Sequence, residues 1–145
     1  NFTLVRGDCR GANGYTDFAT RTVHVRDDLE PAQAVKTLAH EIGHVRADHG
    51  RRFLDPTTRT LSCRGAAEVE AESIAYLVGC ATGLDTTGYS VPYIAGWSGG
   101  DPAVLREAAT QAITVALSID EDLIVQMQPP ETILARTQAM PPPSL

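Results

Sequence analysis

Two histidines and a glutamate lie close together in the sequence, at a spacing that suits a metal-dependent hydrolase. His40 and His44 are four residues apart and Glu41 follows the first, which gives the pattern H-E-x-x-H. Residues four apart on a helix lie one above the other, so both imidazoles can reach one metal ion. Glu41 stands about 100° round such a helix, where its carboxylate can take a proton from a water activated by the metal. The pattern predicts a peptidase with a single zinc ion in each chain and Glu41 as the general base.

The residues around this pattern favour a metal site over a chance match. The alternative is two surface histidines with an incidental glutamate between them, which arises in roughly one chain of this length in several hundred. The pattern lies inside a predicted amphipathic helix that begins near Pro31 and ends near Gly50. Gly43, a poor helix former between the two histidines, indicates a close backbone approach. The apolar positions at helical spacing are Val35, Leu38, Ala39, Ile42 and Val45.

A catalytic zinc site needs a third protein ligand as well as an open position. The candidates lie on a second predicted helix, residues 66–82. Glu68 and Glu72 share one face of this helix, whereas Glu70 points away from it. Glu68 as the ligand, with Glu72 as the partner of a ligating histidine, is the preferred assignment; Glu72 and then Glu70 are the alternative ligands. His49 is a weaker candidate, because its spacing from the histidine pair predicts a residue at the helix end.

Tyrosine and tryptophan side chains follow the second helix in a glycine-rich stretch, residues 83–100. Its composition predicts an ordered loop with short helical turns. Tyr89, Tyr93 and Trp97 are candidates to line a substrate cleft, where a tyrosine hydroxyl could stabilise an oxyanion. Burial in the core is the alternative for Tyr93 and Trp97.

The first 30 residues predict β structure. Residues 20–29 alternate, with Val23 and Val25 on one face and His24 on the other, towards solvent. Turn-forming residues within 11–18 precede this strand. A hairpin or a small antiparallel sheet is therefore expected ahead of the first helix.

Further helices are expected in the C-terminal half. A third helix begins at Asp101-Pro102, a capping residue followed by proline, and continues to about Gln126. In the proline-rich tail we expect a short helix near 131–138 and a flexible end at 139–145. The apolar face of the second helix consists of Val69, Ala71, Ile74, Ala75 and Val78.

Length and charge narrow the class of protein. The 145 residues fit one domain, residues 1–145, and carry a net charge of −6. Phosphate contacts need clustered basic residues. The only adjacent basic pair is Arg51 and Arg52, which we expect in a solvated loop within 50–65. Direct binding of nucleic acid by this domain is therefore not expected.

Cysteine usage and hydropathy indicate a cytoplasmic protein. The three cysteines have wide, irregular spacing, which does not form a disulfide framework and suits a reducing compartment. No apolar run reaches the roughly 18 residues of a membrane span, so no membrane association is expected. Because the chain begins with Asn1 rather than Met, we expect it to be a piece of a longer protein.

Two stretches of the sequence resemble a known family. "VKTLAHEIGHV" (35–45) and "EVEAESIAYLVGCATGLDTTGYSVPYIAGWSG" (68–99) resemble the zincin-like domain at the C-terminus of ArdC-type antirestriction proteins. "TRTVHVRDDLEPAQ" (20–33) is similar as well. More distantly, the chain is similar to the ImmA/IrrE metallopeptidases. The resemblance covers roughly residues 14–120, and the stretch from 68 to 97 is its more specific part.

The resemblance implies a minimal zincin-like α+β fold in which a short sheet packs on the active-site helix. It implies a zinc site of His40, His44 and Glu68, and a protein or peptide as substrate. It also implies a longer parent in which a separate domain ahead of this one binds DNA. The alternative function is a non-proteolytic, zinc-bearing module that binds a partner within an antirestriction or mobile-element protein. A pure binding module would have no need of Glu41, so its presence favours the enzyme.

Overall fold

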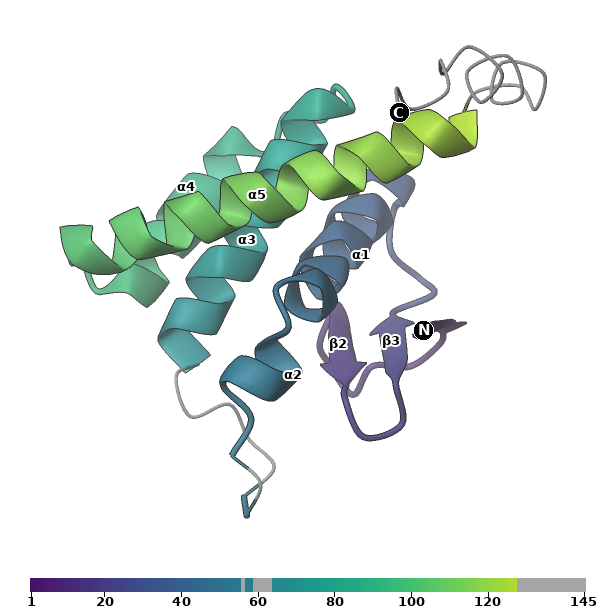
Figure 1. The fold of residues 1–145 in the computed structure, drawn as a ribbon. Helices are drawn as coiled ribbons and strands as arrows, with labels where there is room; N and C mark the ends of the chain where they lie inside the picture. Colours follow the sequence, from purple (N-terminus) through teal and green to yellow (C-terminus); the bar gives the residue numbers. More distant parts are fainter. Residues whose placement is uncertain (56, 59–63, 128–145) are drawn as a thin grey trace, which may run out of the picture.

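The computed structural model describes residues 1–55, 57–58 and 64–127 (Figure 1). A small sheet comes first and helices follow, which confirms the predicted α+β class. The strands are β1 (Thr3–Arg6), β2 (Gly14–Asp17) and β3 (Thr22–Val25). The helices are α1 (Pro31–Arg46), α2 (His49–Arg52), α3 (Arg64–Ala81), α4 (Thr87–Ser98) and α5 (Pro102–Met127).

The sheet is mixed, which corrects the prediction of an all-antiparallel sheet. β2 and β3 form an antiparallel hairpin, but β1 pairs in parallel with β3, and the strand order is β1-β3-β2. β1 and β2 lie on opposite sides of β3, and the hairpin turns β3 back into the direction of β1. Alternation in the sequence reports which face a residue occupies but not the direction in which strands pair. As a result β2 is an edge strand, and it lies next to α1.

One side of α1 packs on the sheet (Figure 1). Val23 and Val25 of β3 are buried and contact Leu38 and Val45 of α1, as the alternating pattern predicts. His24 points to the opposite face of the sheet, where it is partly exposed. Burial of these apolar side chains fixes the position of α1 against the sheet.

The other side of α1 packs on α3 and α5. Ala39 and Ile42 join the cluster of buried side chains between these helices. Val35, predicted on the apolar face, is 51% exposed, so that part of the prediction is wrong. Lys36 is buried in its stead, because its ammonium group forms a 2.7 Å ion pair with Glu72 of α3. Because of this ion pair, Lys36, a polar residue of α1, faces the core between the helices.

Helix α3 is the centre of the helical layer, with α1, α4 and α5 packed around it. Its predicted apolar face is confirmed, since every predicted position is buried. Gly43 of α1 meets α3 closely: an added Cβ would lie 3.2 Å from both the Cα and the carbonyl oxygen of Ala71. The predicted close backbone approach therefore occurs here, and it lets side chains of α1 reach those of α3.

Residues 87–98 form one continuous twelve-residue helix, α4, where the sequence predicted an ordered loop with short helical turns. Its glycines and the internal Pro92 disfavour a helix by propensity. Contacts with α3 compensate for this weakness, as tertiary packing commonly does. The helix ends at Gly99, which has a φ of +61°. α4 directs Ser90, which is fully buried, towards α3.

The predicted loop 50–65 begins within a helix. α1 ends at Arg46, and Asp48 with a φ of +57° turns the chain into the short helix α2. The predicted tail features at 131–138 and 139–145 lie outside the described residues. None of the helices within the described part of the chain is long and apolar enough to cross a membrane.

Candidate metal centre

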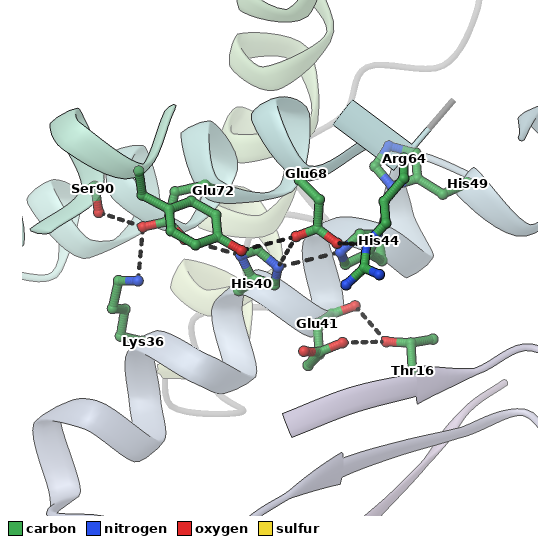
Figure 2. A network of polar contacts seen from close by, with 11 residues as sticks. Thr16, Lys36, His40, Glu41, His44, His49, Arg64, Glu68, Glu72 and Ser90 are labelled. Atoms are coloured by element: carbon green, nitrogen blue, oxygen red, sulfur yellow. Dashed lines mark hydrogen bonds and ion pairs between the residues drawn. The ribbon is translucent and has the colours of Figure 1, made fainter. Parts of the chain in front are cut away.

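The structure brings His40, His44 and Glu68 together between α1 and α3 (Figure 2). The two Nε2 atoms lie 3.2 Å apart, and His40 Nε2 lies 3.4 Å from Glu68 Oε2. One ligand atom from each residue lies within 4.8 Å of the others. Two imidazoles and a carboxylate from neighbouring helices form a donor set that fits a divalent metal ion such as zinc.

Glu72 supports His40 from the side away from the cluster. His40 Nδ1 lies 3.0 Å from Glu72 Oε2, so the ring donates there and Nε2 is left for a metal. Glu72 is 1% exposed, and its Oε1 also accepts from Lys36 Nζ at 2.7 Å and Ser90 Oγ at 2.6 Å. The structure thus puts Glu72 behind His40, whereas Glu68 faces both histidines. No pattern in the sequence predicted that Lys36 and Ser90 contact this carboxylate.

His44 contacts a further histidine. His49 Nδ1 lies 2.8 Å from His44 Nδ1, and His49 Nε2 lies 3.0 Å from Glu70 Oε2. Arg52 holds the same carboxylate through two hydrogen bonds, of 2.6 and 2.9 Å, which corrects the expectation that it lies in a solvated loop. His49 does lie near a helix end, as predicted, but it is fully buried beside the cluster of His40, His44 and Glu68. A straight helix would not bring it there; the turn at Asp48 does.

Glu41 stands beside the cluster without belonging to it. Its side chain is buried, and its Oε2 accepts a 2.8 Å hydrogen bond from Thr16 Oγ1 of β2 (Figure 2). Burial raises the pKa of Glu41, although the charge of His40 and the Thr16 hydrogen bond act in the opposite direction. A raised pKa brings a carboxylate closer to the range of a general base at neutral pH. No pattern in the sequence predicted the contact between Thr16 and Glu41.

The two histidines of the cluster have opposite pKa shifts. Burial lowers the pKa of His40, but hydrogen bonds to Glu68 and Glu72 outweigh it and raise this pKa to about 9. Burial and the charges of His40 and His49 lower the pKa of His44 to about 3. Burial would raise the pKa of Glu68, yet its hydrogen bond to His40 prevails and lowers it to about 2. These surroundings favour a proton on His40 and a neutral ring at His44.

A comparison with known families identifies the fold that carries this geometry. The family of peptidases described as the IrrE N-terminal-like domain matches residues 4–78, from β1 into α3. The chain belongs to this family. No curated protein and no solved structure matches the chain. The match supports an ImmA/IrrE-like, metallopeptidase-like domain that acts on protein, and its range includes His40, Glu41, His44 and Glu68.

A peptidase of this family needs space for its substrate, and a cavity of about 510 Å³ opens beside the cluster. Its walls come from β2, α1, α3 and α4. Tyr93 of α4 lines it, and the Tyr93 hydroxyl donates to Glu68 Oε2 at 3.2 Å. Trp97 lies outside this lining and is 37% exposed beside Arg64, so core burial is wrong for Trp97. The side chain of Tyr89 lies outside the described part of the structure.

Proposed function

We propose that this domain is a zinc peptidase that hydrolyses a peptide bond in a protein target. His40, His44 and Glu68 are the metal ligands, with a single zinc ion in each chain, and Glu41 is the general base. The observation that carries the proposal is the convergence of the three ligand atoms within 4.8 Å of one another, beside a buried carboxylate that is not part of the cluster. Membership of the peptidase family supports the reaction class.

When bound, zinc supplies a positive charge that polarises a carbonyl group and lowers the pKa of water. Glu41 then accepts a proton from the attacking water and passes it to the nitrogen of the leaving amine, as the peptide C–N bond breaks. Its raised pKa helps it to hold that proton between the two steps. Thr16 occupies Oε2 of the carboxylate, which leaves Oε1 as the oxygen that takes the proton.

Tyr93 is the aromatic residue best situated to assist. It lines the same cavity, and its hydroxyl lies beside a proposed ligand, Glu68. A phenol there can donate to the negative charge that develops on the carbonyl oxygen of the substrate. Tyr93 can stabilise this oxyanion because its hydroxyl lies beside Glu68 without being one of the three proposed metal ligands.

The biological setting predicted from the ArdC-type resemblance remains a prediction. The family match ends at residue 78, whereas the stretch that carries that resemblance continues to 97. An antirestriction role, and a DNA-binding domain ahead of this one, belong to that same prediction.

The test compares zinc-loaded wild-type protein with Glu41→Gln on a proteome-derived peptide library read by mass spectrometry. We expect both proteins to contain about one zinc per chain, and only the wild type to generate new peptide ends. Cleavage that survives in Glu41→Gln would refute the assignment of the general base. Zinc binding by a wild type that cleaves neither this library nor folded proteins from a cell extract would favour the partner-binding module instead.

A further inference from the structure

His49 is a completely buried histidine that the proposed reaction does not use. Its side chain is 0% exposed, and both ring nitrogens have partners at hydrogen-bonding distance. On one side lies His44, a proposed ligand, and on the other lies the carboxylate of Glu70. Glu70 is itself held by the guanidinium of Arg52. The four side chains thus form a continuous path from the surface to the metal cluster.

The direction of each hydrogen bond in this path follows from its chemistry. The guanidinium of Arg52 donates to both oxygens of Glu70, through hydrogen bonds of 2.6 and 2.9 Å, so the carboxylate is also the acceptor in its 3.0 Å contact with His49. His49 therefore donates to it through Nε2. A His44 ring that binds a metal through Nε2 keeps its proton on Nδ1, so Nδ1 of His49, 2.8 Å away, accepts that proton. His44 is left with its own lone pair at Nε2, the atom that faces His40 and Glu68.

We infer that His49 is a positioning residue for the metal site, which fixes the ring orientation and the tautomer of His44 by accepting its Nδ1 proton. Glu70 and Arg52 hold His49 in the tautomer that can accept. The inference rests on the proposed metal ligands, but not on peptidase activity. A ligand held in the binding tautomer loses less freedom when the metal binds, so the metal is bound more tightly.

The backbone indicates that this contact is built into the fold. Asp48 adopts the left-handed conformation, with a φ of +57°, which is uncommon for a residue with a side chain. That turn ends α1 and brings His49, five residues beyond His44, back against it. The ion pair between Arg52 of α2 and Glu70 of α3 then fastens the turn to the helical core.

The first test measures zinc affinity by competition with a chromogenic chelator. His49→Leu keeps much of the volume but removes the acceptor, and we expect zinc affinity to fall about 10–100-fold. His49→Asn restores an acceptor near the position of Nδ1 and should recover part of that loss. Arg52→Ala should weaken zinc binding less, whereas Arg51→Ala, a matched control whose side chain is 84% exposed, should leave it unchanged. Circular dichroism of the metal-free variants checks that they are folded.

The second test needs no variant. In zinc-loaded wild-type protein with ¹⁵N-labelled histidine, we expect a scalar coupling between Nδ1 of His44 and Nδ1 of His49 through their shared proton. A missing coupling, or a folded His49→Leu that binds zinc within twofold of wild type, would overturn the inference while the proposed ligands stand. A wild type that binds no zinc would overturn both. If His49→Leu does not fold, the coupling in the wild type decides.

Discussion

The two histidines of the proposed metal site are supported in different ways. Behind His40 stands a carboxylate, Glu72, with a lysine and a serine as its partners. Behind His44 stands a second imidazole ring, His49, and the carboxylate comes one step later. Hydrogen bonds to Glu68 and Glu72 outweigh burial and raise the pKa of His40 to about 9, whereas burial and neighbouring positive charge lower the pKa of His44 to about 3. One histidine is thus prepared to carry a charge and the other to remain neutral.

Because their partners differ, His40 and His44 should contribute to metal binding in different ways. A charged partner behind a ligand makes the ligand more basic, and so both a better donor to metal and a better competitor for protons. A second imidazole behind a ligand controls its orientation and keeps the carboxylate one residue further away. Neighbouring charges favour protonation of a histidine when they are negative and disfavour it when they are positive. Loss of support should therefore have different consequences on the two sides.

The largest effect is expected on the His40 side. Glu72→Ala removes the acceptor behind His40 and leaves the buried ammonium of Lys36 without this carboxylate. Breaking a buried ion pair costs roughly 3–5 kcal/mol of unfolding free energy, and loss of the acceptor should weaken zinc binding by about 10–100-fold. Chemical denaturation of the metal-free protein and chelator competition measure the two losses separately.

A double variant separates charge from hydrogen bonding at this position. Lys36→Met combined with Glu72→Ala removes the ammonium as well, so much of the unfolding free energy should return. Zinc affinity should stay low, since His40 Nδ1 still lacks its acceptor. Full recovery of zinc affinity in the double variant would show that Glu72 acts through stability alone, and the comparison between the two histidines would then fail.

The next effect is a pH dependence that belongs to His40 alone. Its proton must leave before a metal can bind at Nε2, so zinc affinity should rise about tenfold per pH unit from near pH 5 towards pH 9. His44, with a pKa of about 3, contributes nothing in this range. Calorimetry at pH 7 in buffers of different ionisation enthalpy should find about one proton released per zinc bound. Release of no proton at pH 7 would contradict the raised pKa.

The same proton affects the metal-free protein with a definite sign. A pKa that is higher in the folded state than in the unfolded state stabilises the fold at low pH. The contribution of His40 is complete below its ordinary pKa near 6.5 and is lost as the pH rises through about 9. Thermal unfolding of the metal-free protein should therefore occur at lower temperature at pH 9.5 than at pH 6.

The partner of His40, Glu72, could be predicted from the sequence, whereas the partner of His44, His49, could not. Glu68 and Glu72 lie four residues apart on a regular helix, so helical periodicity alone indicates that they share a face. His49 reaches His44 only through the left-handed turn at Asp48, and a regular helical period cannot express such a turn. Its signal was an aspartate near the helix end followed at once by a histidine, which is too common to decide anything.

Elsewhere in the fold, periodic stretches were predicted well and tertiary effects were not. The apolar face of α3 followed from spacing, because that helix is surrounded by others. The exposed Val35 and the buried Lys36 did not, because an ion pair with another helix determines which side of α1 is buried. The parallel pairing of β1 and the helix α4 also depend on contacts between distant segments, which local propensity does not contain.

The smallest effect is expected from loss of the hydrogen bond that Thr16 donates to Glu41, because Glu41 is the proposed base and not a metal ligand. Thr16 reaches Glu41 from the edge strand β2, and its hydroxyl is part-buried. Thr16→Val keeps the shape but removes the donor, and a single hydrogen bond to a charged group contributes about 1.5–3 kcal/mol. Part of this is regained from water in the open cavity, so we expect kcat to fall by about tenfold or less and zinc affinity to stay within twofold of wild type. Thr16→Ser should retain activity because it keeps the hydroxyl. If Thr16→Val instead weakened zinc binding as strongly as Glu72→Ala, base and ligands would form one coupled unit, and the separate supports described for each side chain would have to be treated as a single network.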